Sequence, residues 1–102
     1  MIVIVTTLHK KEDAVNIGKG LLNKRLIACY NLWAIESAYW WKGKILEEPE
    51  TMMIMKTQEQ HYDEVSKFIK DQSGYEVPDI YTVMPEQVHP LFENWIKTET
   101  EN

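Results

Sequence analysis

The hydrophobic positions follow two different periods along the chain. The unbroken β-branched run at residues 2–5 is typical of a central strand buried on both faces, and residues 51–56, apolar on both faces, read as a second buried strand. Between them, apolar residues recur every three or four positions over residues 11–26, which predicts an amphipathic helix. Gly18 falls on the apolar face of this helix, where it allows a close approach to the sheet. The pattern gives no reason for Gly20.

The middle of the chain predicts a hairpin rich in aromatic residues. Residues 27–41 contain no Pro or Gly and read as one long strand, or as two strands with a bend near Trp33. Lys42-Gly43-Lys44 predicts a tight turn in which the glycine supplies a positive φ. Residues 45–46 then form a short returning strand. The glutamates of residues 47–50 are expected on a solvated acidic connection, with a weak site for a hard cation as the alternative.

The second half predicts a helix, a strand and a final short helix. Thr57 and Gln60 match a capping box that opens a helix. That helix is expected to end at Ser73-Gly74 with a left-handed glycine cap. Residues 80–84 form the last predicted strand, and Pro90 is suited to the first turn of a terminal helix.

These elements predict one α+β domain over residues 1–102. The nucleus of the order is β-α-β-β-α-β, the ferredoxin-like sandwich in which helices cover one face of the sheet. The hairpin is longer than this fold requires, and Tyr39-Trp40-Trp41 is more apolar surface than one small domain can cover. A neighbouring subunit is the simplest cover. We expect Tyr39 and Trp41 to lie in or beside a subunit cleft, and Trp40 to face the other way.

Charge and composition narrow the classes of partner. The net charge is −5 and Arg25 is the only arginine, which disfavours nucleic acid because phosphate contacts need clustered basic side chains. No run of 18 or more apolar residues predicts a membrane span, and residues 1–7 lack the features of a signal peptide. The cytoplasm is the expected compartment. Arg25 ends a helix rather than lying in a phosphate-binding loop, so an acylphosphatase-like enzyme on this fold is disfavoured.

A few side chains could carry chemistry. His9, His61 and His89 are widely spaced and are expected on the surface. The single cysteine, Cys29, excludes an intrachain disulfide, and it reads either as a buried thiol or as a weak candidate metal ligand. Lys56 ends an apolar strand, where it can hold an anion at a cleft or pair with Glu76.

Taken together, the segments resemble the CutA family, which is named for divalent-cation tolerance. The resemblance runs from Val3 to about Ile96, with its motifs in the family's order and spacing. It rests on Glu50 and on residues 27–31 (IACYN), 37–45 (SAYWWKGKI), 53–57 (MIMKT), 75–80 (YEVPDI) and 95–96 (WI).

The resemblance implies a tight homotrimer of ferredoxin-like subunits, similar to the trimers of PII signalling proteins. It implies a non-enzymatic role in the response to divalent metal ions, copper among them; a PII-like regulator that binds a small anion is the alternative. The family's shared residues gather at clefts between subunits. In this sequence those residues are Cys29, Asn31, Tyr39, Trp41, Gly43, Lys44, Lys56, Tyr75, Glu76 and Pro78.

The chain departs from copper-binding relatives at two places. Many relatives carry a His-Pro pair just before the tyrosine, where this chain has Gln72-Ser73-Gly74. Those relatives also use a cysteine in the first strand, where this chain has Val5. Both changes remove a good copper donor, an imidazole in one case and a thiolate in the other.

Overall fold

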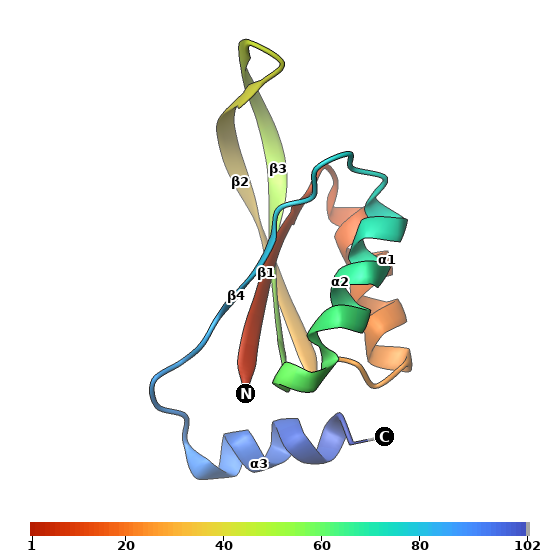
Figure 1. The fold of residues 1–102 in the computed structure, drawn as a ribbon, viewed down its shortest axis with the longest axis vertical. Helices are drawn as coiled ribbons and strands as arrows, with labels where there is room; N and C mark the ends of the chain where they lie inside the picture. Colours follow the sequence, from red (N-terminus) through yellow and green to blue (C-terminus); the bar gives the residue numbers. More distant parts are fainter. Residues whose placement is uncertain (102) are drawn as a thin grey trace.

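The computed structural model describes residues 1–101, which form a four-stranded antiparallel sheet with the first two α-helices packed on one face and the last helix across one end (Figure 1). The strand order is β2-β3-β1-β4. In chain order the elements are β1 (Ile2–Leu8), α1 (Lys11–Asn23), β2 (Cys29–Trp41), β3 (Lys44–Thr57), the 3₁₀ turn η1 (Glu59–His61), α2 (Tyr62–Ser73), β4 (Ile80–Val83) and α3 (Pro90–Glu99). This is the predicted ferredoxin-like α+β sandwich with an extended hairpin and a terminal helix.

Strand β1 lies in the interior of the sheet, as its aliphatic run predicts. Ile4 pairs with Met55 of β3 on one side and with Thr82 of β4 on the other. Ile4 and Met55 are fully buried in the core with residues of α1 and α2, whereas Thr82 at the sheet edge is exposed. The helical face of the sheet is thus covered within one chain, and the opposite face is not.

Two glycines let helix α1 approach its neighbours closely. A Cβ on Gly18 would lie 2.6 Å from the Tyr30 ring and 2.9 Å from Met53 Cε, so the predicted close approach to the sheet is confirmed. A Cβ on Gly20 would lie 2.8 Å from Cζ of Phe68, on α2. The reason for Gly20 is therefore helix–helix contact, which the sequence could not reveal because the two helices lie far apart in the chain.

The hairpin differs from its prediction in one respect. The turn is as expected, with positive φ at Lys42 (49°) and Gly43 (81°). However, β2 and β3 pair without interruption from Cys29–Lys56 to Trp41–Lys44, so the predicted break into a short strand and an acidic loop at residues 47–50 is wrong. Pro49 is tolerated because β3 has a neighbour on only one side there.

The predicted capping box is also wrong. Thr57 is the last residue of β3, fully buried, and its hydroxyl donates to the Leu26 carbonyl (2.7 Å) instead of capping a helix. The helix that follows does end at Gly74, whose φ of 71° gives the expected left-handed cap. The hydrogen-bond partner of Thr57 lies 31 positions away in the chain, so its hydroxyl does not act as a local helix cap.

Helix α3 returns to the end of β3 and buries a histidine. His61 is only 7% exposed, and its Nε2 lies 2.7 Å from the backbone oxygen of Thr100. The prediction that all three histidines lie on the surface is therefore wrong for His61, whereas His9 and His89 are exposed. His89 caps α3, since its Nδ1 accepts from the Leu91 N–H at 3.1 Å. None of the helices in residues 1–101 has the length and hydrophobicity that crossing a bilayer requires.

Candidate functional site

A group of ligand-type side chains forms where β1 ends beside the hairpin. Leu8 pairs with Thr51, so the next residue, His9, comes to lie near Glu50 of β3. Glu48 lies two positions before Glu50 in β3, and therefore on the same face of the strand. The ligand atoms of His9, Glu48 and Glu50 all lie within 4.8 Å of one another. The imidazole Nδ1 and Glu48 Oε1 are 3.6 Å apart.

Tyr39 orients one of these carboxylates. It pairs with Leu46 across the hairpin, and its hydroxyl reaches diagonally to donate a hydrogen bond to Oε1 of Glu48. That hydrogen bond, with burial and the charges of Glu48 and Glu50, raises the pKa of Tyr39 to about 12. Tyr39 is therefore a neutral donor at physiological pH.

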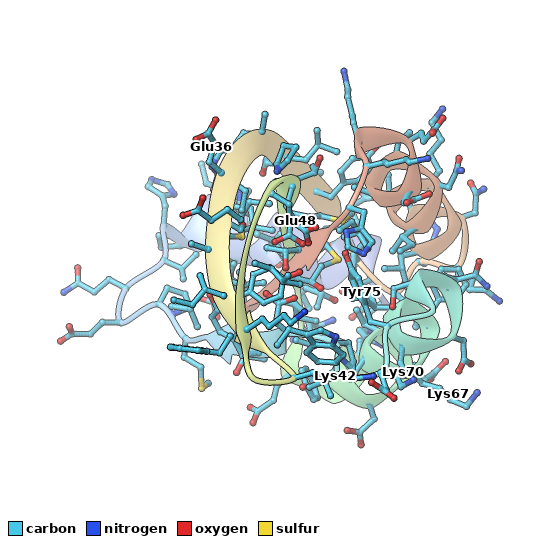
Figure 2. All side chains as sticks on the ribbon, turned by 90° about the horizontal axis from the view of Figure 1, so that it is seen from above. Glu36, Lys42, Glu48, Lys67, Lys70 and Tyr75 are labelled. Carbon is cyan, nitrogen blue, oxygen red and sulfur yellow. The ribbon has the colours of Figure 1, made fainter. Side chains whose placement is uncertain are left out.

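Tyr75 closes the other side of the group. Figure 2 looks down on this end of the molecule and shows Glu48 on the hairpin and Tyr75 between the hairpin and the helices. The Tyr75 ring meets the His9 ring edge to face, with centroids 4.7 Å apart. Its hydroxyl oxygen is buried and has no hydrogen-bond partner among residues 1–101. Burial, followed by the charges of Glu50, Asp79 and Glu48, raises the pKa of Tyr75 above its usual value.

A second group contains Cys29, Asn31 and Lys56, at the opposite end of the hairpin. Lys56 pairs with Cys29 across the strands and donates a hydrogen bond from Nζ to Asn31 Oδ1 at 2.8 Å. Burial raises the pKa of the Cys29 thiol, and the nearby Lys56 charge opposes this shift. Within one chain Lys56 does not pair with Glu76, which instead meets Lys42 at 3.8 Å.

A third group lies at the hairpin tip. The Nζ of Lys42 sits 5.4 Å from the centre of the Trp41 ring, and Lys44 pairs with Trp41 across the turn. Glu76 reaches this group through its ion pair with Lys42. Pro78 is half-buried in the segment that joins Tyr75 to β4.

One chain therefore brings the predicted cleft residues into three separate groups. Along β3, Lys56 and Glu48 are eight residues apart, about 26 Å at the rise of a strand. Sequence reasoning missed His9, Glu48, Asp79 and Thr7 as members of the middle group. The register of β1 against β3 brings these residues together, because it places the residue after Leu8 beside Glu50 and Glu48. The sequence does not reveal this register, since residues 47–50 read as a loop and not as part of a strand.

The strand order and the packing of α1 and α2 on one face define a ferredoxin-like α+β fold. Residues 2–99 match the family model described as CutA1 divalent ion tolerance protein, and the chain belongs to this family. Two relatives named divalent-cation tolerance protein CutA come from Thermotoga maritima and Pyrococcus horikoshii. The first is 40% identical over 97 residues, covering 95% of this chain and 96% of its own. The second is 39% identical over 100 residues, covering 98% of each.

Solved structures agree with this assignment. The structure of the periplasmic divalent cation tolerance protein CutA from Archaeoglobus fulgidus superposes with a TM-score of 0.96 at 36% identity, covering 99% of this chain and all of that one. The structure of CutA1 from Pyrococcus horikoshii gives a TM-score of 0.94 at 37% identity, covering both chains completely. The family resemblance seen in the sequence is thereby confirmed. The cytoplasmic location of this chain stays a prediction.

Proposed function

We propose that this protein serves divalent-cation tolerance as a non-enzymatic homotrimer with ligand clefts between its subunits. The observation that carries the proposal is the uncovered apolar face of the sheet. On the face away from α1 and α2, the large side chains Trp33, Tyr81 and Val83 are 46–50% exposed. Several large apolar side chains left exposed on one sheet face are typical of an assembly surface.

The hairpin supports the same proposal. It extends beyond β1, whose pairing with β3 ends at Leu8–Thr51, and it exposes Trp40 and Ile45 as a cross-strand pair. A long hairpin with exposed aromatic residues needs cover, and a second copy that carries the same face supplies it.

Assembly would also complete the predicted clefts. The group around Lys56 and the group around Tyr75 lie at different ends of β3 in one chain, so a shared site needs one group from each of two subunits. We propose that the cleft residues are those named from the family resemblance: Cys29, Asn31, Tyr39, Trp41, Lys44, Lys56, Tyr75, Glu76 and Pro78. The ligand is proposed to be a divalent metal ion, with copper as one candidate.

Two features favour a binding role over an enzymatic one. The raised pKa keeps Cys29 as the neutral thiol, which is the poor nucleophile of its two forms. Arg25 pairs with Glu99 at 3.0 Å, so its guanidinium is engaged by a carboxylate of the same chain. The alternative, a PII-like regulator that binds a small anion at Lys56 and Tyr75, has less support, because Tyr75 lies among carboxylates and Lys56 is bonded to Asn31.

Light scattering during gel filtration tests the assembly. We expect a mass of three times 12.1 kDa for the protein. Trp41→Ala and Trp33→Ser should weaken the trimer on dilution, whereas Lys19→Ala, on an exposed position of α1, should leave it intact. A monomer at micromolar concentration would refute the trimer and its clefts.

A further inference from the structure

We propose that His9, Glu48 and Glu50 form a binding site for one first-row transition-metal dication within a single subunit. The inference rests on the proposed role in cation tolerance for its biological meaning. It does not depend on the trimer, because all three ligands come from one chain. The sequence pattern allows only a weak hard-cation site at the glutamates of residues 47–50, and it does not predict that His9 joins them.

The distances between the three ligand atoms are close to those in a site that holds a metal ion. Ligand atoms that bind one ion at about 2.0–2.2 Å lie about 3–4 Å from one another. Here the three ligand atoms are within 4.8 Å, and His9 Nδ1 is already 3.6 Å from Glu48 Oε1. Small side-chain rotations would close the remaining gap. The His9 side chain is half exposed, which gives an ion a path from solvent.

A second observation is an unsatisfied polar group beside the proposed ligands. The hydroxyl of Tyr75, whose ring packs against His9, is buried and has no hydrogen-bond partner among residues 1–101. Within residues 1–101, His9 is the one basic side chain that contacts the Glu48 carboxylate, at 3.6 Å. A bound dication would neutralise the group, as is usual where carboxylates gather in a partly buried place.

The neighbouring aromatic residues hold the ligands in place. The Tyr39 hydroxyl donates to the same Glu48 oxygen that faces His9, and the Tyr75 ring packs edge to face against the imidazole. Contacts of this kind fix ligand orientation in known metal sites. Asp79 is bound to Thr7 through both its oxygens, so it positions the Tyr75 segment and is not itself a ligand.

The donor set selects the class of ion. One imidazole nitrogen with two carboxylates suits Zn²⁺, Cu²⁺ and Co²⁺, whereas Ca²⁺ and Mg²⁺ prefer oxygen-only sites. Three protein ligands leave positions for water. Cu⁺ would require sulfur, and Cys29 lies at the other end of the hairpin.

Calorimetric titration of the metal-free protein with Zn²⁺ tests the site, and Ca²⁺ serves as the comparison ion. We expect one Zn²⁺ per chain and no measurable Ca²⁺ binding. His9→Asn and Glu50→Gln should each weaken Zn²⁺ binding at least tenfold, and Tyr39→Phe by about 10-fold or more, as for other residues that support a ligand. Circular dichroism of each variant verifies folding. Co²⁺ binding, followed by visible absorption, should show loss of the nitrogen ligand in His9→Asn.

Two matched controls separate this site from others. His89→Asn removes the other exposed histidine and keeps a side chain that can cap α3. Glu47→Gln removes an exposed carboxylate next to Glu48 that lies on the other face of β3. Both should bind Zn²⁺ like the wild type. If binding survives in folded His9→Asn and Glu50→Gln, the site is refuted while the tolerance role stands. If the wild type binds no Zn²⁺, Cu²⁺ or Co²⁺ stoichiometrically, the proposed cation role fails together with the site.

Discussion

The carboxylate of Asp79 is bound to Thr7 across 72 positions of sequence. The Thr7 hydroxyl lies 2.6 Å from each Asp79 oxygen, and the Thr7 backbone N–H donates to Oδ1 at 3.2 Å. This contact ties the segment after α2 to the end of β1. It thereby holds Tyr75 against His9, at the centre of the proposed cation site.

Replacing the Thr7 hydroxyl should loosen this segment. Thr7→Val keeps the shape of the side chain but removes a hydrogen bond to a charged group, which should lower the free energy of unfolding by about 1–3 kcal/mol. Chemical denaturation measures the loss, and hydrogen exchange should show faster exchange in residues 74–79. The neighbouring Thr6 is the matched control, because its buried hydroxyl has no partner among residues 1–101. Thr6→Val should be neutral or stabilising. Equal losses in both variants would contradict the role of Thr7.

Replacing Gly18 or Gly20 by alanine should change the stability of the protein differently from the same substitution at an ordinary helix position. Alanine is favoured over glycine by about 1 kcal/mol in a helix interior. At Gly18, however, the new methyl group would meet both Tyr30 and Met53, and Gly18→Ala should destabilise by about 1–3 kcal/mol despite that gain. At Gly20 it would meet only the end of the Phe68 ring. Gly20→Ala should therefore lower the stability less than Gly18→Ala does. Thermal denaturation of the two variants measures the difference. A stabilised Gly18→Ala would contradict the packing.

Ionisation of Tyr39 should occur late and depend on Glu48. The hydrogen bond favours the neutral phenol and raises the pKa of Tyr39 to about 12, against about 10 in an unfolded chain. The bond therefore favours the folded state fully below about pH 10, and its contribution is lost as the pH rises toward about 12. Ultraviolet titration should show a phenol that ionises at high pH, and this transition should be absent in Tyr39→Phe. In Glu48→Gln the same transition should move to lower pH. An unchanged titration in Glu48→Gln would exclude the hydrogen bond.

Cys29 should react slowly with alkylating reagents. Burial raises the pKa of its thiol, so little thiolate is present at neutral pH. Iodoacetamide should modify the folded protein more slowly than the urea-unfolded chain, and mass spectrometry gives both rates. The charge of Lys56 opposes the shift, so Lys56→Gln should slow the reaction further. Lys44→Gln, at the far end of the same strand, should not change it. Faster alkylation in Lys56→Gln would show that access, and not ionisation, limits the rate.

Local patterns were sufficient for most of the fold. The run at residues 2–5 identified an interior strand, the periodicity from Lys11 identified α1, and Lys42-Gly43 identified the hairpin turn. The failures share one cause. Thr57 and Glu48 have residue types that are common in caps and loops, and their partners, Leu26 and His9, lie in other elements.

The sequence by itself determined the order of strands and helices, the family, and the excess of aromatic surface on the hairpin. These follow from periodicity, turn residues and motif spacing, which act between neighbours in the chain. The tertiary structure decided which side chains meet: the register of β1 on β3 placed His9 beside Glu48 and Glu50, and the return of the chain placed Tyr75 against them. A shift of one residue would turn the glutamates to the other face. The site is therefore a product of strand pairing, which no local pattern specifies.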